Sequence, residues 1–208
     1  MNEIIKKFHQ KYYDSGVWWK TKWRGIDVLK CPLDMWIYQE LIYKIKPDLI
    51  IETGTYHGGS ALFFADLLGS FKKDSKIITI DIKHAVAMPK HRMIKYIVGS
   101  STDGRVVKEV SAEAKKAKKV MVILDSLHKA PHVKAEMDIY NKFVSVGSYM
   151  IVEDTNIAGN PVKSDWSDGG PAEAVDEFLA KRDNFKVDKG CEKFMVTFNP
   201  GGYLKKVK

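Results

Sequence analysis

Five short apolar runs alternate with segments of helical periodicity between about residue 48 and residue 182, and this alternation is the strongest constraint on the fold. The runs span residues 48–53, 76–81, 93–99, 118–125 and 148–154. Runs that are apolar throughout are typical of strands covered on both faces. Strands joined by helices form a parallel sheet with right-handed crossovers. The sequence therefore predicts an α/β fold with a doubly wound sheet.

The length of 208 residues suits one domain with a substantial core. No repeat or low-complexity linker interrupts the chain, so we expect a single domain over residues 1–208. Within it, residues 1–46 are expected to form an N-terminal helical cap and residues 47–208 the core. Short strand-like segments near the C-terminus are expected to add an antiparallel edge to the mostly parallel sheet. These segments span residues 184–190, 193–199 and 203–207.

Composition places the protein in the globular class, with 45% apolar and 29% charged residues. No apolar run approaches the ~20 residues that cross a bilayer, and the N-terminus lacks the continuous apolar stretch of a secretion signal. We therefore expect a soluble, cytoplasmic protein without a membrane partner. The two cysteines, Cys31 and Cys191, lie far apart, which argues against a disulfide framework or a structural zinc site.

The formal net charge of +8 admits two kinds of partner, a nucleic acid or an anionic substrate. The lysines are dispersed along the chain, however, and the run over residues 112–119 is typical of the solvated end of a helix. The charge pattern therefore argues against a nucleic-acid partner. Four of the five tryptophans lie within residues 1–46, where they could line a substrate site, anchor a homo-oligomer or fill core.

The carboxyl ends of the predicted strands carry acids or small polar residues. In open α/β sheets, ligands bind beyond this edge. The residues expected there are Glu52, Asp81, Ser101, Asp125, Glu153 and Asp154. Capping of strand-to-helix turns explains any one of them. It explains the whole set less well, because carboxylates gathered at one edge repel one another unless a cation or ligand lies between them.

The turn after the first predicted strand reads E-x-G-x-x-x-G-x-S over residues 52–60. Its glycines permit either a tight connection or close approach of the backbone to a ligand. The turn is not the G-x-G-x-x-G that cradles a pyrophosphate, and its leading acid favours a cationic or amino group. Asp81, at the end of the next strand, is placed to accept hydrogen bonds from both hydroxyls of a ribose. S-adenosylmethionine has an amino group, a sulfonium and a ribose, so it suits this pattern better than NAD.

Asp125, Glu153 and Asp154 are candidate ligands of a divalent metal, because neighbouring strand ends lie about 4.8 Å apart. Their oxygen atoms point to Mg²⁺. Successive strand residues point to opposite faces, so Glu153 and Asp154 can both ligate only if the strand has already ended. His128 is the candidate general base, since an unperturbed imidazole has a pKa of ~6.5. His132 is the weaker candidate for that role.

Taken together, the motifs resemble those of the metal-dependent catechol-type O-methyltransferases. The matching stretches are, in order, "ETGTYHGGSA", "ITIDI", "VGSSTD", "LDSLHK" and "IVEDT". With the upstream "KCPLDMWIYQELIYKI" and the later "GGPAEAVDEFL", the chain resembles more specifically the cephalosporin hydroxylase family over residues 18–206. Despite its name, that family has a methyltransferase fold. The resemblance implies a Rossmann-like methyltransferase sheet with additional N-terminal helices.

The resemblance also implies which residues contact S-adenosylmethionine. They are Glu52, Gly54, Tyr56, Ser60, Asp81, Ser101 and Asp125. Glu52 and Ser60 correspond to positions near the methionine part. Asp81 corresponds to the acid that binds the ribose, and Ser101 to a residue beside the adenine.

For the metal, the resemblance implies Asp125, Glu153 and Asp154 as the three magnesium ligands. Two positions depart from the catechol enzymes. His128 stands where they have the lysine that deprotonates the substrate, and Asp154 stands where they have an amide. These two departures leave open which residue is the base and how the charge of the metal is balanced.

The sequence thus predicts a magnesium-dependent O-methyltransferase that uses S-adenosylmethionine to methylate a hydroxyl of a small molecule, such as a natural product, a sugar or an antibiotic intermediate. Asp125 and His128 are the predicted catalytic residues, the metal lowers the pKa of the substrate hydroxyl, and His128 accepts its proton. The polar segment 155–170, with Trp166, is predicted to close over the substrate. Three alternatives stay open: a hydroxylase, as the family is named, an RNA methyltransferase, and a non-catalytic cofactor-binding partner subunit.

Overall fold

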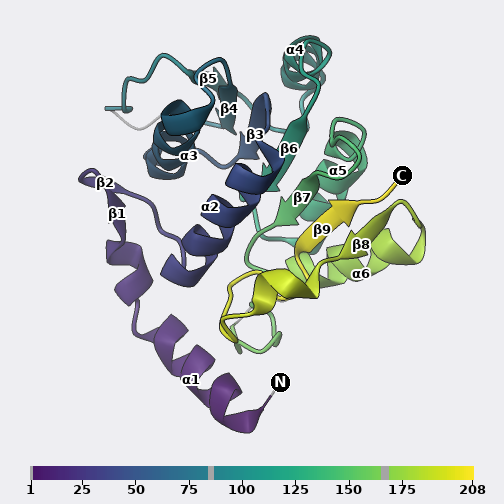
Figure 1. Ribbon diagram of the computed structural model, residues 1–208. Coiled ribbons are helices and arrows are strands. Elements are labelled where there is room, and N and C mark those ends of the chain that lie inside the picture. Colours follow the sequence, from purple (N-terminus) through teal and green to yellow (C-terminus); the bar gives the residue numbers. More distant parts are fainter. Residues whose placement is uncertain (1, 84–86, 165–168) are drawn as a thin grey trace.

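A seven-stranded sheet forms the centre of the computed structural model, which describes residues 2–83, 87–164 and 169–208 (Figure 1). In chain order the strands are β3 (Leu49–Thr53), β4 (Lys76–Asp81), β5 (Ile94–Val98), β6 (Val120–Leu124), β7 (Tyr149–Val152), β8 (Phe185–Val187) and β9 (Tyr203–Lys206). In space their order is β5-β4-β3-β6-β7-β9-β8. The strands from β3 to β7 pair in parallel, and β9 pairs antiparallel with both β7 and β8. The predicted doubly wound sheet with an antiparallel C-terminal edge is confirmed.

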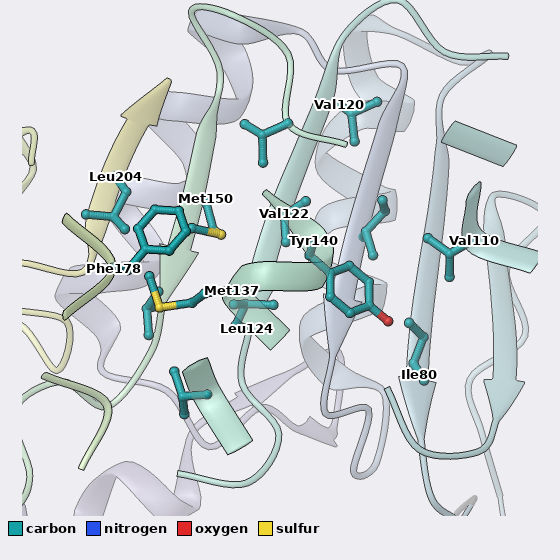
Figure 2. Packing of buried hydrophobic residues seen from close by; sticks show 14 of the residues in the cluster. Ile80, Val110, Val120, Val122, Leu124, Met137, Tyr140, Met150, Phe178 and Leu204 are labelled. Atoms are coloured by element: carbon teal, nitrogen blue, oxygen red, sulfur yellow. The ribbon is translucent and has the colours of Figure 1, made fainter. Parts of the chain in front are cut away.

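Helices cover both faces of the sheet. One face carries α2 (Pro32–Ile45) and α3 (Gly59–Phe71), and the other carries α4 (Gly104–Ala114), α5 (Ala130–Tyr140) and α6 (Pro171–Ala180). Successive strand residues serve opposite faces. Ile50 therefore packs with α2 and α3, whereas Ile51 packs with the other three helices. Figure 2 shows this second cluster, with Tyr140 of α5 and Phe178 of α6 among the sheet side chains.

An N-terminal segment precedes the sheet. It consists of α1 (Glu3–Asp14), a 3₁₀ turn η1 (Val17–Lys20), and a small hairpin of β1 (Lys22–Trp23) and β2 (Ile26–Asp27). The ring of His9 stacks on that of Phe198 at 5.8 Å between centroids, and Phe198 also contacts Tyr13 and Trp18. Helix α1 is thus attached to the chain that connects η2 (Lys189–Glu192) to β9. No described helix combines the length and apolar character needed to cross a bilayer.

One local prediction is wrong, because residues 193–199 form turns and not a strand. A buried carboxylate explains this result: Asp34 of α2 accepts hydrogen bonds from the Thr197 hydroxyl and the Phe198 amide. These bonds direct the backbone of that stretch toward α2 instead of toward a neighbouring strand.

The polar segment predicted as a lid is fixed to the body over residues 155–164. It forms no helix or strand, as expected, but Ile157 and Val162 are buried. Asn156 hydrogen-bonds to His9 at 3.1 Å, and the Lys163 amide donates to Gln10 Oε1 at 2.8 Å. Helix α1 and this segment therefore support each other. Trp166, the predicted closing residue, lies outside the described residues.

Gly54, in the turn after β3, offers a test of how closely β3 and β6 approach at their ends. Its φ is +88°, and a Cβ there would lie 1.8 Å from the carbonyl oxygen of Asp125. We expect Gly54→Ala to lower the free energy of unfolding by about 3 kcal/mol or more, because a backbone atom must move. Gly201→Ala is the matched control, since its φ is +76° and its Cβ would meet open space. The control should cost only about 1–2 kcal/mol, and equal losses in urea unfolding would contradict the contact.

His9 makes stability depend on pH. Burial lowers the pKa of His9 from 6.5 to about 4. The folded state therefore holds a neutral imidazole, whose contribution is complete above pH 6.5 and is lost as the pH falls through 4. That contribution is on the order of 3 kcal/mol. We expect the free energy of unfolding of the wild type to approach that of His9→Gln as the pH is lowered from 7 to 4.5. Parallel curves for the two proteins would show that His9 is not buried as a neutral group.

Candidate active site

A cavity of about 500 Å³ opens at the carboxyl ends of the parallel strands. It lies where the strand order reverses between β3 and β6, which is the place where doubly wound sheets bind ligands. The turn after β3, the ends of β4 and β5, and the segment after β6 contribute to its lining. Its volume is in the range of small-molecule sites. The strand ends that the sequence marked as polar thus meet in one cavity.

The glycines of the turn after β3 serve a tight connection. Gly54 lies against the backbone of Asp125, and a Cβ on Gly59 would lie 2.2 Å from the carbonyl oxygen of Asp27. Gly54, Gly59, Tyr56 and Ser60 also line the cavity, so the packed turn is itself a wall of the site. The glycines of this turn therefore serve both purposes: they allow close packing against neighbouring backbone, and they line the cavity.

Glu52 lies beneath this turn and is fully buried. Its Oε2 accepts a hydrogen bond from the Thr79 hydroxyl at 2.6 Å, and Ser60 also bonds to the carboxylate. Its Oε1 has no hydrogen-bond partner among the described residues. Burial raises the pKa of Glu52 to about 7, although Lys30 opposes this rise. The carboxylate therefore lies one layer behind Ser60, which itself lines the cavity.

Asp81, at the end of β4, lines the cavity and orders the turn after β3. Its Oδ2 accepts hydrogen bonds from the amides of Thr55 and Tyr56, both at 2.9 Å. From the described residues, its Oδ1 receives only a long bond of 3.4 Å from the Lys83 amide. One carboxylate oxygen is thus used by the protein, and the other keeps acceptor capacity toward a ligand in the cavity.

Ser101, after β5, also lines the cavity and is only 5% exposed. Its hydroxyl lies 3.4 Å from His132 Nε2, and its carbonyl accepts a bond from the Tyr140 hydroxyl. His132 lies 3.2 Å from the Ser126 hydroxyl and 3.5 Å from Glu136, and that bond to Glu136 raises the pKa of His132. His132 is therefore held in a network of its own, on the Ser101 side of the cavity.

Asp125, His128 and Asp154 form a second group in the lining of the cavity. His128 Nε2 lies 3.2 Å from Asp154 Oδ2 and 3.9 Å from Asp125 Oδ1. One potential ligand atom from each of the three residues falls within 4.8 Å of the others, so the group could hold a metal ion. Strand β7 ends at Val152, and Asp154 has a left-handed φ of 54°. The strand has therefore ended before the two acids, as the metal hypothesis required.

Glu153 is placed differently from its neighbour Asp154. Its Oε1 accepts hydrogen bonds from the Lys30 ammonium at 2.5 Å and from the Tyr38 hydroxyl at 2.7 Å. Lys30 also bonds to Asp125 Oδ2 at 2.6 Å. Lys30 is 2% exposed and Glu153 is 5% exposed, so this contact is buried. The structure brings Asp125 and Asp154 to the cavity, and it brings Glu153 to a lysine.

Charge explains this arrangement. Burial raises the pKa values of Asp125, Glu153 and Asp154, and proximity to one another raises them further. Burial alone would lower the pKa of Lys30, but attraction to Asp125 and Glu153 outweighs it and raises that pKa above its ordinary value. The cations Lys30 and His128 oppose this rise and favour the ionised carboxylates. A divalent ion fits the side that faces the cavity.

The aromatic residues of the N-terminal segment divide between several places. Trp18 lines the cavity together with Tyr13 and Ile157, near Asp154. Burial raises the pKa of Tyr13, and the negative charge of Asp154 raises it further. Trp19, by contrast, is 62% exposed. Of these two neighbouring tryptophans, only Trp18 lines the cavity.

Sequence reasoning missed Lys30 and Tyr38. Lys30 lies two residues before Pro32, which is the first residue of α2. A cation near a helix N-terminus opposes the helix dipole, and this unfavourable position was the available signal for a special role. Tyr38 carried no comparable signal, because an aromatic residue on an apolar helix face is usually core.

The family described as "Rhamnosyl O-methyltransferase/CmcI" matches residues 15–207 of the chain. The rhamnosyl O-methyltransferase of Mycobacterium tuberculosis is 36% identical over 207 residues, which cover 97% of this chain and 84% of that protein. The protein of the same name from Mycobacterium leprae is 35% identical, with 98% of this chain and 90% of that protein covered.

Solved structures of CmcI share the fold. An apo structure superposes with a TM-score of 0.70 at 23% identity, covering 90% of this chain and 76% of that one. A second, described with Mg and SAM, has a TM-score of 0.70 at 22% identity and covers 91% and 78%. At this identity the likeness concerns the fold, whereas the curated relatives carry the family assignment. The predicted family and methyl-transfer chemistry are confirmed: the chain belongs to the rhamnosyl O-methyltransferase/CmcI family and is an S-adenosylmethionine-dependent O-methyltransferase.

Proposed function

We propose that the protein transfers the methyl group of S-adenosylmethionine to a hydroxyl of a deoxysugar, in a reaction that uses Mg²⁺. The sugar is suggested by the mycobacterial relatives, which are named for a rhamnosyl acceptor. One observation carries the proposal. Asp81 and the group of Asp125, His128 and Asp154 line the same cavity, so a nucleoside and a reacting hydroxyl can be held next to each other.

The residues at the β3 and β4 ends suit the methyl donor. Asp81 Oδ1 can accept from a ribose hydroxyl, because its Oδ2 is already used by the turn. Ser60 and the buried Glu52 suit the amino group of the methionine part, since Glu52 Oε1 lacks a partner among the described residues. Ser101 also lines the cavity and suits a position beside the adenine.

The metal is best held by Asp125 and Asp154. Mg²⁺ prefers oxygen ligands and is usually bound by one or two carboxylates, with water and substrate oxygens completing six positions. A bound Mg²⁺ would lower the pKa of a hydroxyl that ligates it. Because of this preference for oxygen, we assign His128 the role of general base and not that of a ligand.

The proton of the acceptor hydroxyl passes to His128 Nε2. The Asp154 carboxylate, 3.2 Å from that nitrogen, stabilises the imidazolium that forms. The acceptor oxygen then bonds to the methyl carbon as the carbon–sulfur bond breaks, and the sulfonium becomes a neutral thioether. The cavity contributes chiefly by holding the two reactants in line.

The acceptor side of the cavity suits a sugar ring. Trp18 and Tyr13 offer aromatic surfaces, against which the C–H groups of a pyranose can pack. The Trp18 indole is fixed in place, because its Nε1 donates to the Tyr13 carbonyl and its ring lies edge-on to Phe198. Rigid aromatic walls with a few convergent polar groups are typical of small-molecule sites.

Cofactor and metal binding can be separated with two variants. Asp81→Asn keeps an oxygen for the turn amides but loses the free acceptor, so we expect S-adenosylmethionine to bind at least about tenfold more weakly. Asp125→Asn should leave that affinity within about threefold and weaken Mg²⁺ binding at least about tenfold. Calorimetric titration of each ligand measures both. Normal cofactor affinity in Asp81→Asn would refute the assignment of the ribose.

The base can be tested with two histidines of the same cavity. His128→Gln should lower kcat by about 10²–10⁴, the usual effect of removing a general base, with methyl rhamnoside as acceptor. Cofactor and Mg²⁺ affinities should change little. His132→Gln is the matched control and should lower kcat less than about tenfold. If the control loses as much activity as His128→Gln, the proton acceptor has been misidentified.

A further inference from the structure

Four connections lead from the end of a helix to the start of the next parallel strand, at the edge of the sheet opposite the cavity. They join α2 to β3, α3 to β4, α4 to β6 and α5 to β7. Neighbouring connections are bonded to each other. The Asp48 amide donates to the Lys119 carbonyl and the Lys76 amide to the Asp48 carbonyl, both at 2.8 Å. The Val120 amide donates to the Ser145 hydroxyl at 3.0 Å. The four connections therefore form one continuous surface.

This surface, the basic edge, carries most of the net charge of the protein. It comprises residues 44–49, 71–76, 113–120 and 142–149. These stretches hold ten lysines and three acids, which give a formal charge of +7, whereas the whole chain carries +8. The lysines are Lys44, Lys46, Lys72, Lys73, Lys76, Lys115, Lys116, Lys118, Lys119 and Lys142. Lysines that are dispersed along the sequence are thus gathered by the fold at one edge of the sheet.

Three of these ten lysines form salt bridges. Lys72 pairs with Asp48 at 2.7 Å. Glu113 pairs with Lys76 at 2.8 Å and with Lys116 at 3.4 Å. The other seven lysines form no salt bridge within the part of the chain that the structure describes, and each of them is exposed. Their positive charges therefore face solvent together.

The helix dipole explains only a small part of this concentration. A cation in the last turn of a helix is stabilising, and the effect falls off beyond that turn. This reason covers Lys44, in the last turn of α2. Helices α3, α4 and α5, however, have no basic residue in their last turns, and their lysines lie in the connections that follow. Like charges gathered in this way repel one another. An anionic partner would relieve that repulsion.

Apolar side chains are also exposed on or beside the basic edge. Val146 lies in the connection to β7 and is 66% exposed. Tyr43 directly precedes the first connection and is 56% exposed, and the Lys46 ammonium lies 5.2 Å from the centre of its ring. Lysines combined with exposed apolar and aromatic side chains are typical of protein surfaces that lie at the headgroup level of a bilayer.

The type of cation distinguishes between a lipid surface and a nucleic acid. All ten cations of the basic edge are lysines. Arginine is the residue that suits bidentate contacts to phosphate in nucleic-acid recognition, whereas lysine acts as a point charge. Clusters of such point charges are attracted to the diffuse negative potential of anionic lipids. The composition of the basic edge therefore favours a lipid surface.

We propose that the basic edge docks on an anionic lipid surface, with its lysines among the headgroups and Val146 in the interface. The cavity lies at the opposite ends of the same strands, so docking leaves it open to an acceptor that arrives from the aqueous side. This inference goes beyond the proposed function and replaces the expectation of a protein without a membrane partner. A peripheral contact of this kind requires no membrane-spanning helix.

Sedimentation of the full chain with lipid vesicles tests the proposal. The wild type should bind vesicles of phosphatidylcholine and phosphatidylglycerol in equal parts but not vesicles of phosphatidylcholine alone, and binding should weaken as the salt concentration rises. Lys44→Gln/Lys73→Gln/Lys115→Gln removes three unpaired charges from three different connections. This variant should bind the anionic vesicles at least about tenfold more weakly. A wild type that does not bind them overturns the proposal.

Lys7→Gln/Lys11→Gln/Lys20→Gln is the matched control. It removes the same charge from exposed positions of the N-terminal segment, which lies beside the cavity. Vesicle affinity should stay within about threefold of the wild type, because charges beyond the Debye length of the docked surface are screened. Equal losses in the two triple variants would show that total charge and not the basic edge causes binding, which refutes the proposal. Unchanged affinity for S-adenosylmethionine shows that each variant is folded.

A fluorescent label identifies the docking face without any change of charge. Both native cysteines, Cys31 and Cys191, are buried, so the fluorophore NBD can be attached selectively to Val146→Cys. Its emission should shift to the blue when anionic vesicles are added. Trp19→Cys is the control, because Trp19 has a similar exposure of 62% but lies in the N-terminal segment, and its label should not respond. A response at residue 19 with none at residue 146 would contradict the proposal.

Single-stranded RNA serves as the competing polyanion. If the wild type binds RNA at a salt concentration that releases it from anionic vesicles, the basic edge serves a nucleic acid and the proposal is wrong. Vesicle binding requires neither methyl donor nor Mg²⁺. A failure of the proposed function would therefore leave this inference standing, and a failure of vesicle binding would leave the proposed function standing.

Discussion

The crowding of carboxylates at one edge of the sheet is the constraint on which the rest of the site depends. The parallel register aligns the strand ends, since Thr53 pairs with Ile80 on one side and with Leu124 on the other. Asp81 is the last residue of β4, and Asp125 follows directly after the end of β6. A sheet built in this way gathers acids that would repel one another. Positive charge must therefore reach this edge from another part of the chain or from a ligand.

The N-terminal segment meets part of that requirement. It passes so close to the start of α3 that a Cβ on Gly59 would lie 2.2 Å from the carbonyl oxygen of Asp27. This contact fixes the path of the backbone that brings Lys30 to Asp125 and Glu153. The same segment continues into α2, where Tyr38 donates to Glu153. The N-terminal segment and the core thus share one set of charges and cannot be assigned separate roles.

Much of this was accessible from the sequence, and the limits have physical causes. Apolar runs and turn residues predicted the five parallel strands, because strands buried on both faces have an unmistakable composition. The acids at the strand ends predicted the cavity, because parallel topology alone brings them together. Lys30 could not be placed, because its position depends on a left-handed turn at Leu29 and a long-range contact that local sequence does not encode. Because the position of Lys30 could not be predicted, the sequence also could not show that Glu153 contacts this lysine while the adjacent Asp154 lines the cavity.

The acceptor side of the cavity has a different origin from the cofactor side. Gly54, Asp81 and Ser101 are held by the sheet, so their positions follow from the topology of the fold. Tyr13, Trp18 and Ile157 come from α1, η1 and the segment after β7, which are held to each other by the bonds of His9 to Asn156 and of Gln10 to Lys163. Residues outside the sheet can change without disturbing strand pairing. We therefore expect the identity of the acceptor to be encoded in this outer layer, and the transfer chemistry to be encoded in the sheet.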